Sequence, residues 1–282
     1  MFNRVAVLGI GLIGGSFALA LKERGLASRI VGMARREETL QLALQSGVCD
    51  EVTADAVVAA QDADLVFLAS PVGGMASLCA QIASVVAPGC LVTDGGSTKE
   101  RVVQECEPLF ENAHFIGGHP MAGSAQTGPG AARADLFQNA VWIITPTSRT
   151  DPNSLHRLRA LVAKLGAHTI EMAPDTHDEL LAVSSHLPHL TASALVHSFL
   201  KSKTDAPQIA ELVAGGWRDS TRVAAGSAEM WRDICLDNAS SIERALSDFT
   251  RELEALRALV AARDAEALEN WLEKAAQERR NF

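Results

Sequence analysis

The stretch that decides the fold lies near the start of the chain, which reads Val5-Ala6-Val7-Leu8-Gly9-Ile10-Gly11-Leu12-Ile13-Gly14-Gly15-Ser16. The apolar run predicts a buried strand, and the glycines after it match the G-x-G-x-x-G pattern that opens a helix in dinucleotide-binding folds. Such glycines permit a tight turn, close approach of a pyrophosphate and packing of helix on strand. We therefore expect a cofactor to contact Gly9, Gly11, Leu12, Ile13 and Gly14 at the helix N-terminus. The alternative is a glycine-rich turn that binds nothing.

The end of the second expected strand bears on which dinucleotide is bound. NAD-binding proteins carry an acidic residue about 20 residues beyond the glycines, where it accepts hydrogen bonds from the ribose hydroxyls. This chain has Ala34 there, followed by Arg35 and Arg36. The missing carboxylate removes an obstacle to a 2′-phosphate, with which a guanidinium pairs well. We predict NADP, with NAD as the less favoured cofactor, unless both arginines are solvated surface residues.

Short apolar runs alternate with helical patterns through residues 1–172. Near-continuous apolar strands separated by helices predict a parallel sheet covered on both faces. The expected strands are residues 5–9, 30–34, 65–69, 90–94, 114–116, 141–145 and 168–172, and the expected helices are 16–25, 40–47, 75–86, 99–110 and 155–165. Such sheets bind ligands at the carboxyl ends of their strands, so we also expect Ser70 and Pro71 to contact the cofactor.

The strand pattern stops after Pro174. Residues 175–202, 206–215, 229–261 and 264–280 read as helices rich in Ala, Leu and Glu. The fold class is therefore α/β, with a Rossmann-type doubly wound sheet over residues 1–172 and an all-helical domain over residues 173–282. An apolar stripe recurs near the helical period in this second domain. It predicts a homodimer formed through the helical domain, or alternatively packing within the chain, and consists of Ile234, Ala245, Leu246, Phe249, Leu253, Leu256 and Val260.

The composition excludes several classes of function. The chain of 282 residues contains no tyrosine, so no mechanism that needs a phenol applies, and 48% of its residues are apolar, as in globular proteins. A formal net charge of −9 argues against nucleic acid or an anionic membrane as the main partner. Glycines break the N-terminal apolar run far short of the ~20 residues that span a bilayer. Five cysteines without a C-x-x-C pair, and no visible signal peptide, indicate reduced thiols in a cytoplasmic protein.

Three further segments carry polar side chains where this fold binds ligands. Two of them leave expected strands at their carboxyl ends, and the third lies near the start of the helical domain. They read Asp94-Gly95-Gly96-Ser97-Thr98-Lys99, Gly117-Gly118-His119-Pro120-Met121-Ala122-Gly123-Ser124 and Ser184-Ser185-His186-Leu187-Pro188-His189.

Together with the glycine motif, these segments resemble the prephenate/arogenate dehydrogenase family of tyrosine biosynthesis. Residues 217–224 and 230–233 also look like motifs of that family's helical domain, so the resemblance covers essentially the whole chain. It implies oxidative decarboxylation of a cyclohexadienyl acid, with hydride transfer to a nicotinamide cofactor. Prephenate, arogenate and use of both stay open as substrates, because no acidic residue can be placed at the side-chain end of the pocket.

The resemblance also implies the roles of individual residues. His119 matches the family's catalytic histidine, and a neutral imidazole suits the acceptance of the substrate's hydroxyl proton near pH 7. Ser97 matches a serine that hydrogen-bonds near the hydroxyl and the nicotinamide. Arg222 matches the arginine that binds the ring carboxylate, and His189 matches a second histidine at the substrate.

Other polar residues have weaker assignments. Further candidates for the substrate site are Ser124, Ser185, Asp219 and Trp231. Lys99 either shapes the loop of Ser97 or is exposed. We expect no metal, since the i, i+3 pair of His186 and His189 lacks a third ligand. Five histidines have no motif around them and are expected at the surface or as satisfied core residues, namely His114, His156, His168, His177 and His197.

One rival enzyme family needs catalytic residues that this chain lacks. Two other rival functions would leave polar motifs of this chain without a role. A β-hydroxyacid dehydrogenase typically has a catalytic lysine and an asparagine near the start of its helical domain, and residues 175–200 contain neither. A pyrroline-carboxylate reductase has no counterpart to the His119 motif. A non-catalytic NADP sensor would need the glycine motif but not Ser97, His119, His189 and Arg222 together.

Overall fold

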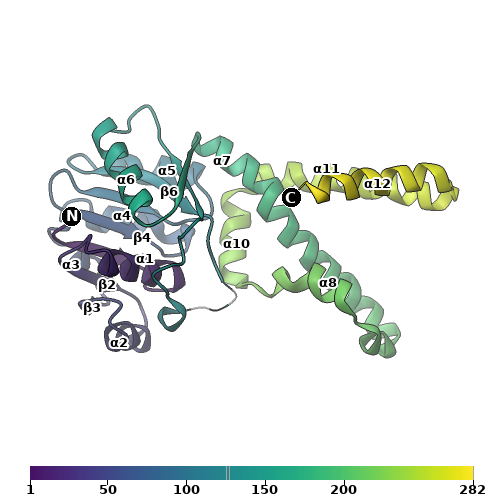
Figure 1. The fold of residues 1–282 in the computed structure, drawn as a ribbon, viewed down its shortest axis with the longest axis horizontal. Coiled ribbons are helices and arrows are strands. Elements are labelled where there is room, and N and C mark those ends of the chain that lie inside the picture. Colours follow the sequence, from purple (N-terminus) through teal and green to yellow (C-terminus); the bar gives the residue numbers. More distant parts are fainter. Residues whose placement is uncertain (125, 127, 282) are drawn as a thin grey trace.

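The computed structural model describes residues 1–124, 126 and 128–281, in which an eight-stranded sheet is followed by an array of helices (Figure 1). The strand order is β3-β2-β1-β4-β5-β6-β7-β8. The strands are β1 (Val5–Leu8), β2 (Ile30–Met33), β3 (Glu51–Thr53), β4 (Leu65–Leu68), β5 (Leu91–Asp94), β6 (His114–Pro120), β7 (Val141–Thr145) and β8 (His168–Glu171). Because β1 lies between β2 and β4, the winding reverses there, where doubly wound sheets bind dinucleotides.

Helices cover both faces of this sheet, as the apolar strands require. They are α1 (Leu12–Glu23), α2 (Glu37–Gln45), α3 (Ala56–Ala60), α4 (Met75–Ile82), α5 (Glu100–Cys106) and α6 (Pro152–Lys164). Successive residues of β1 enter different clusters, with Val5 and Val7 on one face and Ala6 and Leu8 on the other. This alternation is the period-2 geometry of a strand that is buried on both sides.

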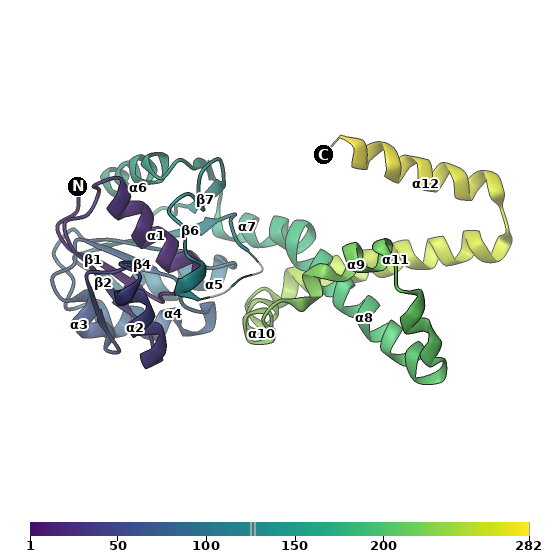
Figure 2. The same cartoon turned by 60° about the horizontal axis from the view of Figure 1, so that its bottom comes forward.

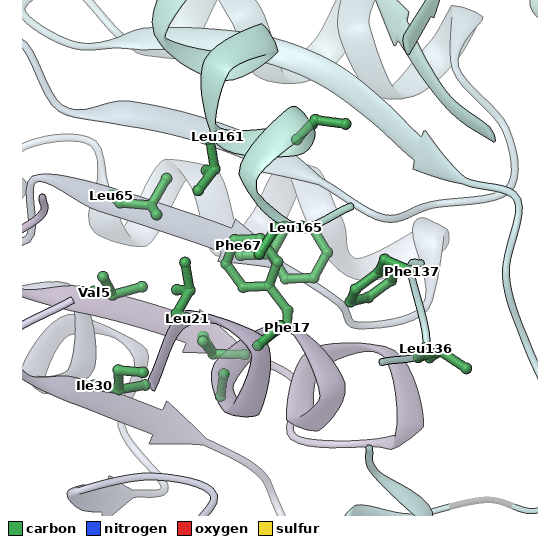
Figure 3. Close-up of a cluster of buried hydrophobic side chains, with 14 of the residues drawn as sticks. Val5, Phe17, Leu21, Ile30, Leu65, Phe67, Leu136, Phe137, Leu161 and Leu165 are labelled. Carbon is green, nitrogen blue, oxygen red and sulfur yellow. The ribbon is translucent and has the colours of Figure 1, made fainter. Parts of the chain in front are cut away.

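Aromatic rings fill the centre of one face (Figure 3). The rings of Phe17 from α1 and Phe67 from β4 stack with their centroids 4.1 Å apart. Trp142 of β7 lies 5.2 Å from Phe137 and 5.9 Å from Phe67, and all four side chains are fully buried. Strands far apart in sequence are thus joined in one core.

The sheet departs from the expected topology at two places. β7 runs antiparallel to β6, with His119 opposite Ile143, whereas the apolar runs predicted a wholly parallel sheet. The described residues between the two strands form a 3-10 turn at Pro129–Ala131 and further hydrogen-bonded turns, but no α-helix. A parallel neighbour would need a crossover connection of that kind. The short β3 and α3 were not predicted, because three partly exposed strand residues and five helical residues give too little periodicity.

The helical region also differs from its predicted segments. Its helices are α7 (Pro174–Leu181), α8 (Leu187–Asp205), α9 (Gly215–Thr221), α10 (Ala228–Asp237), α11 (Ala239–Ala262) and α12 (Ala265–Arg280). A π-turn at Ala182–His186 separates α7 from α8, and Pro188, which lacks a backbone N–H, is the second residue of α8. The expected helix at 206–215 is a 3-10 turn at Pro207–Leu212, and α9 was not expected.

The prediction of a single helix over residues 229–261 is wrong, because the helix is interrupted at Asn238. The Asn238 side chain donates hydrogen bonds from Nδ2 to the Asp178 carbonyl oxygen (2.7 Å) and to His186 Nδ1 (3.3 Å). Since Asn238 is buried, these bonds fix its backbone outside the helical geometry of α10 and α11.

The long C-terminal helices extend away from the sheet (Figures 1 and 2). α12 returns from the far end of α11, and none of its residues is buried. Of the predicted apolar stripe, Ile234 and Ala245 are buried, whereas Leu253 is 49% and Val260 is 58% exposed. Packing within the chain therefore fully buries only the part of the stripe nearest the sheet, and Phe249 and Leu256 are partly buried.

A buried ion pair holds the turn that follows β5. Asp94 ends the strand and pairs with the ammonium of Lys99, and both side chains are fully buried. The remaining acceptor sites of Asp94 take the backbone N–H groups of Gly96 (2.8 Å) and Gly118 (2.9 Å). Of the two alternatives for Lys99, exposure is thus wrong, and the side chain shapes the loop that carries Ser97.

We predict that Lys99→Met lowers the free energy of unfolding by roughly 3–5 kcal/mol, because it leaves the Asp94 carboxylate buried without a counter-ion. Urea denaturation followed by circular dichroism measures the change. The matched control is Arg251→Met, which breaks an exposed pair with Asp248 and should cost less than about 1 kcal/mol. Equal losses in the two variants would contradict the structural role of the buried pair.

Candidate active site

A cleft of about 1270 Å³ runs along the carboxyl ends of β1, β2 and β4. Its wall includes seven of the residues expected to contact a cofactor, namely Gly9, Gly11, Ala34, Arg35, Arg36, Ser70 and Pro71. Leu12, Ile13 and Gly14 lie behind this surface at the start of α1. The helical region closes one side through α10, which packs against the turn at Val72–Gly74.

The glycine loop has the geometry that a dinucleotide requires. Gly9 has a φ of +111°, and a Cβ atom there would lie 2.6 Å from the backbone of Ala69. A Cβ at Gly14 would lie 2.0 Å from the Gly9 carbonyl oxygen, whereas one at Gly11 would meet nothing within 4 Å. The loop is therefore packed tightly at Gly9 and Gly14 and open at Gly11, which lines the cleft directly before α1 begins. These residues fit a dinucleotide phosphate.

Two arginine side chains at the adenosine end of the cleft are available to bind an anion. Arg35 and Arg36 are exposed and line the cleft, and within the described residues neither guanidinium forms an ion pair. The nearby Asp55 side chain accepts hydrogen bonds from the N–H groups of Val57 and Val58, so it caps α3. The carboxylate at this end of the cleft is thus already engaged.

His119 lies at the carboxyl end of β6 and is buried against the helical region. Its Nδ1 atom is 2.8 Å from Nε2 of His177, and Nδ1 of His177 is 2.7 Å from Oδ1 of Asp178. His177 is fully buried and Asp178 nearly so. The three side chains form a continuous hydrogen-bonded row that links the sheet to α7.

Burial controls the protonation of this row. It lowers the pKa of His119 well below the ordinary value of 6.5, and the neighbouring His177, Lys99 and His186 lower it further. Burial likewise lowers the pKa of His177, although the hydrogen bond that His177 donates to Asp178 opposes the shift. Both imidazoles are therefore neutral at pH 7, the state in which a histidine accepts a proton.

The carboxylate of Asp178 also fixes the loop of Ser97. Its Oδ1 accepts the N–H of Lys99 (2.7 Å) and its Oδ2 accepts the N–H of Glu100 (2.9 Å), where α5 begins. Ser97 lies two residues before this contact and is half-buried. Thr98 donates to Asp237 of α10 (3.2 Å), so the helical region holds this loop from two elements.

A second cluster contains the substrate residues expected in the helical region. The ring of His189 stacks on Trp231 with centroids 3.5 Å apart, and Trp231 meets His186 edge-on at 6.0 Å. Burial lowers the pKa of His189, opposed by a hydrogen bond to the Val223 backbone. Arg222 precedes that contact, is exposed, and begins a 3-10 turn that packs against α8.

The remaining candidates lie at the margin of these clusters. Ser185 is half-buried in the π-turn, and Asp219 is exposed on α9. Ser124 is exposed and its Oγ accepts the N–H of Gln126 (3.1 Å), while its neighbours 125 and 127 lie outside the described residues.

Sequence reasoning missed the residues behind His119. His177 was assigned only to the surface or to a satisfied core, and Asp178 and Asn238 received no role. The helical spacing of His177 and Leu181, both buried, marks the inner face of α7. That spacing could have identified a buried His-Asp pair, although not its partner on β6.

The described residues offer neither a metal cluster nor a membrane-spanning helix. Within residues 1–124, 126 and 128–281, no group of three or more His, Cys, Asp or Glu side chains is arranged to hold a metal ion. Among the helices described, none is long and apolar enough to span a bilayer.

Comparison with known proteins assigns the family. Residues 17–171 match the family model of the prephenate dehydrogenase nucleotide-binding domain, and residues 173–274 that of the prephenate dehydrogenase dimerization domain. The chain is 38% identical to the prephenate dehydrogenase of Bacillus subtilis, over 98% of this chain and 75% of that protein. It is 33% identical to the cyclohexadienyl dehydrogenase of Zymomonas mobilis, over 95% of this chain and 92% of that protein.

A solved structure shares the whole fold. The prephenate dehydrogenase of A. aeolicus in complex with hydroxyphenyl propionate and NAD+ superposes with a TM-score of 0.91 at 30% identity, over 100% of this chain and 98% of that one. The resemblance seen in the motifs is confirmed over both regions, and the chain belongs to the prephenate dehydrogenase family of NAD(P)-dependent oxidoreductases.

Proposed function

We propose that this protein oxidatively decarboxylates prephenate, arogenate or both in tyrosine biosynthesis, with hydride transfer to NAD(P)+ and a preference for NADP+. The observation that carries the proposal is the buried His119 in its row with His177 and Asp178, beside the Ser97 loop and at the same sheet edge as the dinucleotide cleft. Residues 1–172 bind the cofactor in this proposal, and residues 173–282 complete the substrate site and form the dimer.

The chain's own groups handle one proton and the ring carboxylate. When bound, the oxidised nicotinamide supplies the hydride acceptor. His119 takes the proton of the 4-hydroxyl as hydride leaves the same carbon, and a ketone forms on the ring. The ring carboxylate then departs as CO₂, its bonding electrons make the ring aromatic, and His119 returns the proton to the phenolic oxygen. Proton acceptance of this kind needs a neutral base within hydrogen-bond reach.

The other residues orient the substrate in this scheme. The Ser97 hydroxyl hydrogen-bonds at the reacting hydroxyl, and Arg222 pairs with the ring carboxylate through its planar guanidinium. His189 contacts the substrate from the helical side, with Ser124 and Ser185 at the rim. Correct placement of reacting atoms supplies several kcal/mol in reactions of this kind.

The activity is tested with prephenate and arogenate, each combined with NAD+ and NADP+. Formation of reduced nicotinamide is followed by absorbance, and released CO₂ is measured in parallel. We expect equal amounts of both products with at least one combination. The absence of reduction in all four combinations would overturn the proposal.

We predict that His119→Asn lowers kcat by roughly 10²–10⁴-fold, the usual contribution of a general base, and leaves cofactor affinity unchanged. His114→Asn is the matched control, since His114 begins the same strand outside the site. Steady-state kinetics and cofactor titration measure both quantities. Loss of cofactor binding in His119→Asn would show a structural role instead.

The NADP preference is supported by Ala34 and the two arginines at the cleft. An unpaired guanidinium at this edge can form charge-assisted hydrogen bonds to a 2′-phosphate, and no carboxylate at position 34 opposes it. NAD+ lacks that phosphate and gains nothing from these groups.

We predict that the triple variant Ala34→Asp, Arg35→Ala, Arg36→Ala reverses the cofactor preference. Hydrogen bonds to charged groups contribute about 1.5–3 kcal/mol each, so kcat/KM with NADP+ should fall at least about tenfold relative to NAD+. The control Arg149→Ala removes an exposed arginine from the turn after β7. An unchanged ratio of the two kcat/KM values in the triple variant would refute the proposal for this loop.

A homodimer through the helical region is supported by the half-exposed leucine and valine side chains of α11 and by α12, which buries none of its residues. Apolar stripes of this kind on projecting helices commonly mark subunit interfaces.

We predict that Leu253→Glu shifts the protein from dimer to monomer in sedimentation velocity. The control Leu42→Glu changes a leucine of similar exposure on α2 and should leave the dimer intact. A wild-type monomer at micromolar concentration would contradict the interface.

A further inference from the structure

The row from Asp178 to His119 determines which nitrogen of each imidazole carries a proton. Both oxygens of Asp178 accept backbone N–H groups, from Lys99 and Glu100, so the carboxyl group acts as an acceptor. The 2.7 Å contact to Oδ1 therefore requires a proton on Nδ1 of His177. A neutral His177 then has a lone pair on Nε2, and the 2.8 Å contact requires His119 to donate from Nδ1.

We propose that His177 and Asp178 are positioning residues that fix His119 in the tautomer whose Nε2 atom is the proton acceptor. The proposal rests on the proposed function, in which His119 is the base. Neither side chain touches the substrate in this scheme. Asp178 also holds the backbone at the start of α5, so one carboxylate positions His119 and the loop of Ser97 together.

The same row stabilises the proton once His119 has taken it. Imidazolium at His119 donates from Nδ1 to a neutral His177, which donates in turn to the negative carboxylate of Asp178. The other ionisable groups around His119 and His177 are His186 from the π-turn and the paired Lys99 and Asp94 from the turn after β5. Lys99 and His186 disfavour positive charge at His119. Asp178 favours the charged form of His177 and acts on His119 through the hydrogen bond between the two rings.

The chemistry of a carboxamide shows why Asp178 cannot be replaced. Three N–H groups point at its two oxygens, from Lys99, Glu100 and His177. Asparagine offers one oxygen, and its NH₂ group takes the place of either Oδ1 or Oδ2. With the NH₂ group in the place of Oδ1, it faces both the N–H of Lys99 and Nδ1 of His177. The proton of His177 then moves to Nε2, and His119 is left with its proton on Nε2. The base is then in the wrong tautomer, a change that costs roughly 10⁴-fold in kcat in the serine protease triad.

The test uses His177→Leu, His177→Gln and Asp178→Asn, with Asp175→Asn as the control from the exposed first turn of α7. The Leu variant removes the acceptor for His119 and should lower kcat roughly 10²–10⁴-fold with little change in KM or cofactor affinity. The Gln variant offers an amide oxygen to His119 and leaves Asp178 in place, so it should recover about tenfold or more of that loss.

The pH profile separates positioning from folding. The acidic limb of kcat/KM reports the protonation of His119 in the free enzyme. Loss of the negative charge in Asp178→Asn destabilises the imidazolium, so the limb should move to lower pH, whereas Asp175→Asn should leave it in place. An unmoved limb, or equal kcat in the Leu and Gln variants, would overturn the proposal. Failure of the proposed function is distinct, since the wild-type chain would then be inactive or His119→Asn fully active.

Discussion

The carboxylate of Asp178 is the contact on which the site depends. It arises in the helical region, on the inner face of α7, yet its partners are the backbone at the start of α5 and the imidazole of His177. A buried carboxylate is costly unless hydrogen bonds satisfy it, and here three N–H groups do so. The catalytic geometry therefore exists only when the sheet and the helical region are docked. This explains how His119 and His177, 58 positions apart in the sequence, can act on one proton.

The remaining features of the site follow from burial. Asp94 and Lys99 neutralise each other beneath the Ser97 loop, and His119 stays neutral because an imidazolium in that environment is disfavoured. Because these groups are buried, removing one partner of an interaction destabilises the site. A single missing partner leaves a charge or a polar group without compensation, whereas exposed ion pairs on the outer helices contribute little.

Much of the fold could be predicted from the sequence, because apolar runs and glycines act locally. The dinucleotide motif, seven of the eight strands and the all-helical C-terminal region follow from such patterns. The antiparallel β7 and the break at Asn238 could not, since each depends on contacts with distant residues. The same distinction holds in the site. His119, Ser97 and the cleft residues stand in motifs, whereas His177 and Asp178 acquire their significance from a partner on another element.

The most direct test is the protonation of His119 in the wild-type chain. Long-range ¹H–¹⁵N correlation spectra of protein labelled at its eight histidines distinguish protonated from bare ring nitrogens, and the spectrum of His119→Asn assigns the resonance. At pH 7 to 8, we predict that His119 and His177 are both neutral, with the proton on Nδ1 and a bare Nε2. A proton on Nε2 of His119, or a charged His119 at this pH, would contradict the proposed base and the row of side chains that positions it.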